Sequence, residues 1–301
     1  MSDFVHIKSI AEVHRLFGLG KPLHPLISIS WHQAGKDFDF GDTKFTSDLY
    51  LISLKGNIRG AFTYGRNSYD FEEGTMVFIA PGQVTSFGLF RFALDDPGWS
   101  IVFHPDLIRK SPLSNLIRDY LFFSYNVNEA LHLSEKEKIT LTDLVRQIET
   151  EIQQNTDKHS QALILVLLET ILKYCHRYYD RQFYTRTNLN SDSLAQFERY
   201  LENYFSSEEL LNHGLPTVNQ CGAALNMSGP YLSDLLRLET GKGALAYIHA
   251  HVIEKSKTLL LNSKDSISEA AYRLGFKYPQ HFSKLFKSRT GLNPSEYRIL
   301  N

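Results

Sequence analysis

The chain has 301 residues, of which 43% are hydrophobic and 22% charged, and its formal net charge is −1. These totals exclude an intrinsically disordered chain and a protein covered with basic charge, and they allow two domains with hydrophobic cores. The two cysteines, Cys175 and Cys221, lie in apolar surroundings and favour small buried side chains in a reducing compartment.

Neither a secretory signal nor a membrane span is expected. The first residues do not have the charged start and apolar core of a signal peptide. The longest uninterrupted apolar run, Ala162–Leu168, has seven residues, whereas a helix needs about 20 to cross a bilayer. We therefore expect a cytoplasmic protein that does not use a membrane.

Residues 24–105 have the pattern of a β domain. Short segments rich in β-branched and aromatic residues alternate with turn-forming residues. These segments are Ile27–Trp31, Leu49–Leu54, Gly60–Tyr64, Met76–Ile79 and Trp99–Phe103. Many short strands at this spacing predict a β-sandwich or a small β-barrel, which we place within residues 1–130.

Aromatic side chains in the predicted strands are candidates for binding a small molecule at the mouth of such a barrel. They are Trp31, Tyr50, Phe62, Tyr64, Phe78 and Trp99. The alternative is that these side chains fill the core of the β domain. The residues do not indicate a ligand class.

Residues 131–180 are predicted to form a helical dimerisation segment. Ser134 and Glu137 resemble a capping box, and the apolar residues that follow recur at helical spacing as far as Ile152. A second helix over 158–179 is apolar nearly all round between Ala162 and Leu172, so it needs cover on two sides. A second subunit would give that cover, and a single-chain core is the alternative. The polar residues 181–194 have no period and predict a linker.

The last eighty residues contain one pattern twice, which indicates an internal duplication. The first pairs of matching positions are 49 residues apart, and the later pairs are 50 apart because the second copy has one more residue in its turn. The pairs include Val218 and Ile267, Gly222 and Ala271, Leu225 and Leu274, Leu232 and Phe282, Leu236 and Phe286, Thr240 and Thr290, and Gly241 and Gly291.

Each copy has the pattern of a helix-turn-helix unit. In the first, Val218–Leu225 precedes a turn, and Ser228 caps a helix that runs to about Leu238. In the second, Ile267–Leu274 precedes a turn in which Gly275 supplies a positive φ, and Pro279 begins the next helix.

The outward residues of both second helices are candidates for contact with DNA. Gln, Lys, Ser and His at these positions can reach base edges or phosphates in a major groove. The candidates are Ser228, Gly229, Tyr231, Ser233, Asp234 and Arg237 in the first unit, and Lys277, Gln280, His281, Ser283, Lys284 and Lys287 in the second. The alternative is a polar helix face with no partner.

Charge and length agree with this interpretation. Residues 271–298 hold six Lys and Arg against the single acid Glu296, a local balance of +5 that suits a phosphate backbone. One long helix is predicted over Ala244–Leu261, about 27 Å at 1.5 Å per residue. Successive major grooves on one face of DNA lie about 34 Å apart, so such a helix could place both units in adjacent grooves.

These residues resemble the C-terminal domain of the AraC/XylS family of bacterial transcription regulators. The resemblance covers residues 195–301 and is strongest over Ile267–Ala271, Gly275-Phe276, His281–Lys287 and Thr290–Arg298. Within it, Val252 and Ser256 stand where the family usually has arginine and alanine. The segment Gly74–Gln83 is similar, more weakly, to the cupin-like sensor domain of many family members.

The resemblance implies an α+β chain with a cupin-like β-barrel, a helical dimerisation segment and a domain of two helix-turn-helix units. Its implied partners are double-stranded promoter DNA, a second copy of the chain, RNA polymerase and a small-molecule effector. Metal-dependent cupins hold their ion with a His-x-His pair that this sequence does not have, and Gln83 stands where a metal histidine could follow, so we expect no metal and no cofactor.

The predicted function is therefore sequence-specific transcription regulation rather than catalysis. Three alternatives remain open at this point. They are a regulator controlled by a partner protein without a small molecule, a cupin enzyme fused to a DNA-binding domain, and an architectural DNA binder without sequence preference.

Overall fold

The computed structural model describes residues 4–32, 37–55, 58–64, 67–71, 74–92, 98–126, 129–154, 157, 159–185 and 187–300. The chain forms two compact units, Met1–Tyr184 and Thr185–Asn301. Among the described residues, no helix combines the length and the apolarity that a bilayer crossing requires.

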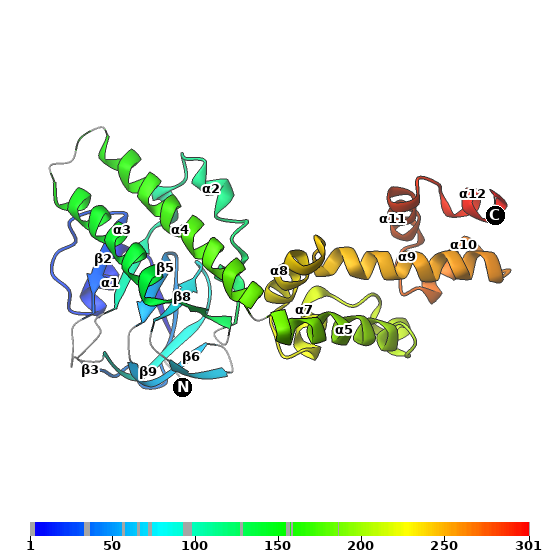
Figure 1. Cartoon of the computed structure of the whole chain (residues 1–301), viewed down its shortest axis with the longest axis horizontal. Helices are drawn as coiled ribbons and strands as arrows, with labels where there is room; N and C mark the ends of the chain where they lie inside the picture. The colour runs from blue at the N-terminus through cyan, green and yellow to red at the C-terminus, as the bar shows by residue number, and fades with distance from the viewer. Residues whose placement is uncertain are drawn as a thin grey trace. The chain divides into compact units, whose positions relative to one another are not determined.

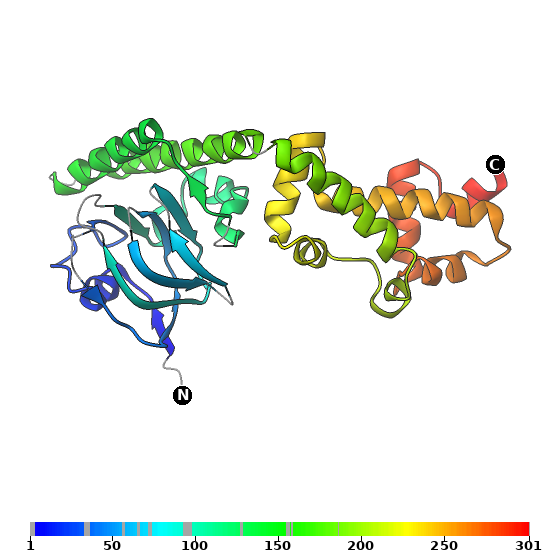
Figure 2. The ribbon, with the colours of Figure 1, turned by 60° about the horizontal axis from the view of Figure 1, so that its bottom comes forward.

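The first unit is built on two β-sheets (Figures 1 and 2). One sheet has the order β1-β4-β9-β6-β7, with β3 paired to β9, and the other has the order β11-β8-β5-β10-β2. The strands of the first sheet are β1 (Phe4–Ile7), β3 (Asp37–Phe38), β4 (Lys44–Ser47), β6 (Ile58–Tyr64), β7 (Asn67–Phe71) and β9 (Thr85–Phe92). Those of the second are β2 (Ile27–Trp31), β5 (Tyr50–Lys55), β8 (Thr75–Ile79), β10 (Trp99–Phe103) and β11 (Leu131–His132).

All five predicted strand segments are present, within two residues at each end. The further strands β1, β3, β4, β7, β9 and β11 were not predicted. Several of them, such as Lys44–Ser47 and Asn67–Phe71, are polar or short, so neither alternation nor β-branched content marks them. The small elements of this unit are α1 (Ile10–Leu16), η1 (Pro105–Leu107), α2 (Leu113–Leu116) and η2 (Leu121–Ser124).

Two helices, α3 (Glu135–Gln153) and α4 (Ser160–Thr185), cover one face of the second sheet (Figures 1 and 2). Ser134 and Glu137 form the predicted capping box at the start of α3. The indole Nε1 of Trp99 donates to Thr142 Oγ1 at 3.1 Å, and that of Trp31 donates to Glu149 Oε2 at 2.9 Å. The sheet and α3 are therefore fixed to each other by polar contacts as well as by burial.

The interval 181–194 differs from the expected irregular linker. Helix α4 continues to Thr185, and α5 (Thr187–Tyr204) begins two residues later. Polar composition without an apolar period predicts a loop, yet a helix can continue through polar residues of moderate propensity when the rest of the helix is packed. The boundary between the two units falls inside this interval.

The second unit is helical. Its elements are α5, α6 (Glu209–His213), α7 (Val218–Ala224), α8 (Gly229–Thr240), α9 (Ala244–Asn262), α10 (Ile267–Arg273), α11 (Pro279–Thr290) and α12 (Pro294–Leu300). Its core includes Leu232 and Leu236 of α8, Phe282 and Phe286 of α11, and Val252 of α9, all almost fully buried. The paired inward positions of the sequence repeat therefore meet in one core. Cys221 lies in the same core, where burial raises the pKa of its thiol to about 11.

Candidate nucleic-acid interface

The two helix-turn-helix units, α7–α8 and α10–α11, reproduce each other at the level of single hydrogen bonds. The N–H of Met227 donates to the carbonyl of Gly222, and the N–H of Phe276 donates to that of Ala271, each at 3.0 Å. Thr217 with Gln220 and Ser266 with Glu269 form capping boxes at the start of each first helix. The duplication seen in the sequence is thus a duplication of structure.

The ends of the second helices also match. Thr240 Oγ1 accepts from the N–H of Lys242 and donates to the carbonyl of Leu236; Thr290 does the same with Leu292 and Phe286. Gly241 and Gly291 follow with φ of 74° and 82°, the left-handed conformation that ends a helix.

The two turns differ where the repeat offset changes. A Cβ on Gly222 would lie 2.7 Å from the N of Gly229 and from the carbonyl oxygen of Met227, so the shorter first turn brings α8 against α7 more closely than an alanine allows. In the second helix-turn-helix unit, Ala271 occupies the equivalent position and is fully buried. One residue more in the second turn gives room for that methyl group.

Helix α11 presents a polar, basic outer face. Gln280, His281, Lys284 and Lys287 are exposed, and Ser283 is half-buried. Lys277 lies just before the helix, with its Nζ 5.8 Å from the ring centre of Tyr278. Side chains of this kind can donate to guanine and adenine acceptors and to phosphate oxygens.

Helix α8 differs from the expectation at two of its candidate positions. Tyr231 is only 7% exposed, and Gly229 packs against Asn219 of α7, so neither faces outward. The assignment of faces failed because the close approach of α8 to α7 buries the first turn of the recognition helix.

The remaining candidates of α8 are engaged within the protein. Ser233 Oγ accepts from the N–H of Ala244 at 3.3 Å and so joins α8 to the start of α9. Asp234 and Arg237 form an ion pair along the helix. Ser228 caps the helix by accepting from the N–H of Tyr231.

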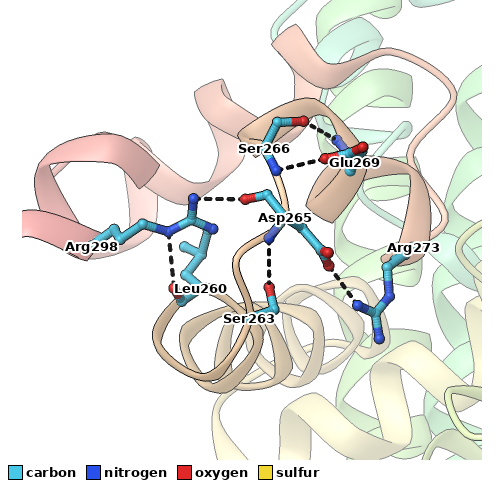
Figure 3. Close-up of polar contacts among 7 residues, drawn as sticks. All are labelled: Leu260, Ser263, Asp265, Ser266, Glu269, Arg273 and Arg298. Atoms are coloured by element: carbon cyan, nitrogen blue, oxygen red, sulfur yellow. Dashed lines mark hydrogen bonds and ion pairs between the residues drawn. The ribbon is translucent and has the colours of Figure 1, made fainter.

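Two of the six basic residues counted over 271–298 hold the fold together (Figure 3). Arg298 of α12 donates from Nε to the carbonyl of Leu260 at 2.9 Å and from Nη1 to that of Asp265 at 2.7 Å. The carboxylate of Asp265 pairs with Arg273. Arg298 therefore ties the C-terminal helix to the last turn of α9 and to the turn before α10. Sequence reasoning missed this role because backbone carbonyls leave no residue signature.

In the first unit, the described ligand candidates Trp31, Tyr50, Phe78 and Trp99 share one face of the second sheet. Strand pairing places Tyr50 opposite Phe103, and Leu54, which shares the face of Tyr50, opposite Trp99. This is the face that α3 and α4 cover, so these side chains do not point into the space between the two sheets. The side chains of Phe62 and Tyr64 lie outside the described part of the structure.

Gln83 has a structural role in the turn after β8. Its Oε1 accepts from the N–H of Ala80 at 2.7 Å, and its Nε2 donates to the carbonyl of Phe123 at 2.6 Å. Both ends of the amide are engaged in holding this turn against η2.

The chain is similar to known DNA-binding proteins over its second unit. A family model described as a helix-turn-helix domain matches residues 221–299. The xylose operon regulatory protein of Escherichia coli (strain K12) is 33% identical over 84 residues, which are 28% of this chain and 21% of that protein. The C-terminal domain of AraT, a response regulator from Geobacillus stearothermophilus, aligns at 28% identity over 36% of this chain and 84% of that one, with a TM-score of 0.32.

One relative is similar over most of its length. The HTH-type transcriptional activator RhaR of Mannheimia succiniciproducens is 22% identical over 257 residues, 84% of each chain. By contrast, the chain spans only about a fifth of the xylose operon regulatory protein that it matches. These two relatives are an operon regulatory protein and a transcriptional activator.

Proposed function

Because the second unit is a helix-turn-helix domain of the AraC/XylS type, we propose that this chain is a sequence-specific transcription regulator that binds promoter DNA as a dimer. The observation that carries the proposal is the pair of helix-turn-helix units with matching hydrogen bonds and caps, of which α11 presents an exposed face of Gln280, His281, Lys284 and Lys287. A cytoplasmic location follows from this function, since bacterial promoters lie in the cytoplasm.

The contacts with DNA divide into two kinds. Gln280 and His281, near the start of α11, reach base edges, with Ser283 beside them. Lys277, Lys284 and Lys287 contact phosphates or guanine acceptors. In the first helix-turn-helix unit, the corresponding helix is α8, and its candidates for contact with DNA are Ser228, Ser233, Asp234 and Arg237. Helix α9 has 19 residues, about 28 Å at 1.5 Å per residue, which suits two recognition helices in neighbouring grooves.

Dimerisation uses α3 and α4. Leu163 and Val166 of α4 are 50% and 62% exposed, and Ile139 of α3 is also exposed. Exposed aliphatic side chains on paired helices gain free energy when a second subunit covers them. The opposite side of α4 packs into the core of its own chain, where Leu168 and Leu172 are fully buried.

A small-molecule effector binds between the two sheets, which we take to form a cupin-like barrel. On the face of β10 that looks toward the other sheet, the hydroxyl of Ser100 forms hydrogen bonds with Ser53 Oγ at 2.7 Å and with His32 Nε2 at 2.8 Å. Lys55 lies on the same face of β5. Leu51 and Ser100 are half-buried although β5 and β10 are central strands, whereas Ile52 and Ile101 on the helix side are fully buried. Ser53 and Lys55 on the inner face are themselves buried, and polar groups on this face support a polar effector there.

Effector binding then changes the dimer or the freedom of the DNA-binding domain, and with it the recruitment of RNA polymerase. A ligand that leaves both operator affinity and transcription unchanged would contradict this coupling.

The division of DNA contacts is tested with Gln280→Ala and Lys287→Ala. The first should lose about 1–3 kcal/mol at one base position if its contact is bidentate. The second should weaken all sequences similarly and flatten the salt dependence. Equal behaviour of the two variants in both measurements would contradict these roles.

A further inference from the structure

The two recognition helices carry opposite charge at equivalent positions. With the offset of 50 residues, Asp234 of α8 corresponds to Lys284 of α11, and Glu239 corresponds to Arg289. Residues Gly229–Thr240 include two acidic residues and one basic residue, a net charge of −1. Residues Pro279–Thr290 include three basic residues and no acidic residue, a net charge of +3. Duplicated helices thus present different fields to the same polyanion.

The one basic residue of α8 is paired with an acid of the same helix, although its side chain is 54% exposed. Arg237 pairs with Asp234 one turn earlier, and its Nη2 lies 3.2 Å from the position that a Cβ on Gly243 would take. The guanidinium is therefore directed along the helix and toward the turn before α9. A phosphate that this guanidinium contacts would lie close to the carboxylate of Asp234, which repels it.

The base-reading positions are also unequal. Gln280 and His281 are exposed at the start of α11. The equivalent residues of α8 are Pro230, which has no polar group, and Tyr231, which is buried. The α7–α8 unit therefore has fewer groups that reach base edges, and the net charge of its recognition helix is unfavourable for binding to DNA.

From these observations we infer that the α11 unit supplies most of the affinity and base reading, and that Asp234 weakens the contact of the α8 unit with phosphates. This inference rests on the proposed DNA-binding function. Asp234 is in this account a specificity-determining residue, because it makes the chain depend on the half-site of the second unit.

The test uses the full chain and a preferred duplex obtained by selection from random sequences. Binding is measured over a range of salt concentrations for matched variants, Arg237→Ala with Lys287→Ala and Asp234→Lys with Lys284→Asp. Arg237→Ala should change affinity less than about threefold, whereas Lys287→Ala should lose about tenfold and flatten the slope of log K against log salt by about 0.9.

Asp234→Lys should tighten binding and steepen that slope by a similar amount. Asp234→Asn, which keeps the shape of the side chain and removes its charge, should tighten binding by less than Asp234→Lys does, and melting by circular dichroism controls for folding. The inference is overturned if Arg237→Ala costs as much as Lys287→Ala, or if either Asp234 variant fails to tighten binding while the fold is intact. If wild type prefers no duplex over random DNA, the proposed function itself fails, and the two failures are thus distinguished.

Discussion

Asn226 and Gly275 occupy the same turn position of the two helix-turn-helix units, 49 residues apart, and both have a left-handed backbone, with φ of 59° and 82°. Asn226 is the non-glycine residue with positive φ in the described chain. The same chain reversal is therefore made once by a glycine and once by an asparagine, the residue that tolerates this conformation best after glycine.

Substitutions at these two positions should have unequal effects on the stability of the protein. Asn226→Gly removes the cost of a left-handed side chain and should leave stability unchanged or raise it by up to about 1 kcal/mol. Gly275→Ala should destabilise by more than about 1 kcal/mol, because the new Cβ meets Leu210 Cδ1 at 2.7 Å as well as the unfavourable φ. Urea unfolding followed by circular dichroism measures both; equal losses would show that the two turns are not equivalent.

Gly222→Ala is expected to destabilise the second unit by about 1–3 kcal/mol, because its Cβ would overlap the backbone of α8. The sign is informative, since glycine to alanine inside a helix ordinarily stabilises by about 0.5–1 kcal/mol. The matched variant is Ala271→Gly at the equivalent position, which should cost about 1 kcal/mol by helix propensity alone. A stabilised Gly222→Ala protein would mean that the first turn opens without cost.

The contacts of Arg298 predict a loss of about 1.5–3 kcal/mol for Arg298→Met, which keeps the apolar stem and removes both donors to the carbonyls of Leu260 and Asp265. Arg298→Lys can restore one donor and should recover part of the loss. Thermal unfolding of both variants gives the comparison. If Arg298→Met unfolds at the same temperature as the wild type, these hydrogen bonds make no net contribution to the free energy of unfolding, and the turn before α10 is held by packing.

Burial lowers the pKa of Lys55 to about 8, which predicts a pH-dependent stability of the first unit. The ordinary value is 10.5, so the unfolded chain holds this proton more tightly, and folding is penalised by about 3 kcal/mol at and below pH 8. Because the unfolded state binds more protons between pH 8 and 10.5, this penalty disappears across that interval as pH rises.

Lys55→Met should therefore be more stable than wild type at pH 7, and its advantage should shrink toward pH 10.5. Both tryptophans, Trp31 and Trp99, lie in the first unit, so tryptophan fluorescence during urea unfolding reports on that unit alone. Lys44→Met removes a positive charge from the exposed part of the same unit and serves as the control. An advantage of Lys55→Met that is constant with pH would rule out the buried charge as its cause.

The helix-turn-helix units could be predicted from sequence because their information is repeated and local. Matching residues such as Leu232 and Phe282 are buried for the same reason in both copies, and caps at Ser228 and Ser266 mark helix starts. Burial of Tyr231 could not be predicted, since it depends on how closely α8 approaches α7, which the side-chain pattern of α8 does not encode.

In the first unit, five strands were predicted. Polar or short strands such as β4 and β7 were missed, and so were β1 and β9, although both contain apolar residues. The arrangement of aromatic residues could not be predicted, because alternation assigns Trp99 and Ser100 to opposite faces of β10 without saying which face the helices cover. The hydrogen bond from Trp99 to Thr142 identifies that face, and it joins residues 43 apart in the chain.

Sequence-specific binding is tested by selecting preferred sites from random duplexes with the purified full chain, followed by competition with unrelated DNA. We predict enrichment of a defined sequence that binds at least about 10³-fold more tightly than unrelated DNA at the same salt concentration, with the enrichment lost in a Gln280→Ala, Lys284→Ala double variant that still folds. Binding that is equal for selected and unrelated duplexes, or that is unaffected by this variant, would contradict it.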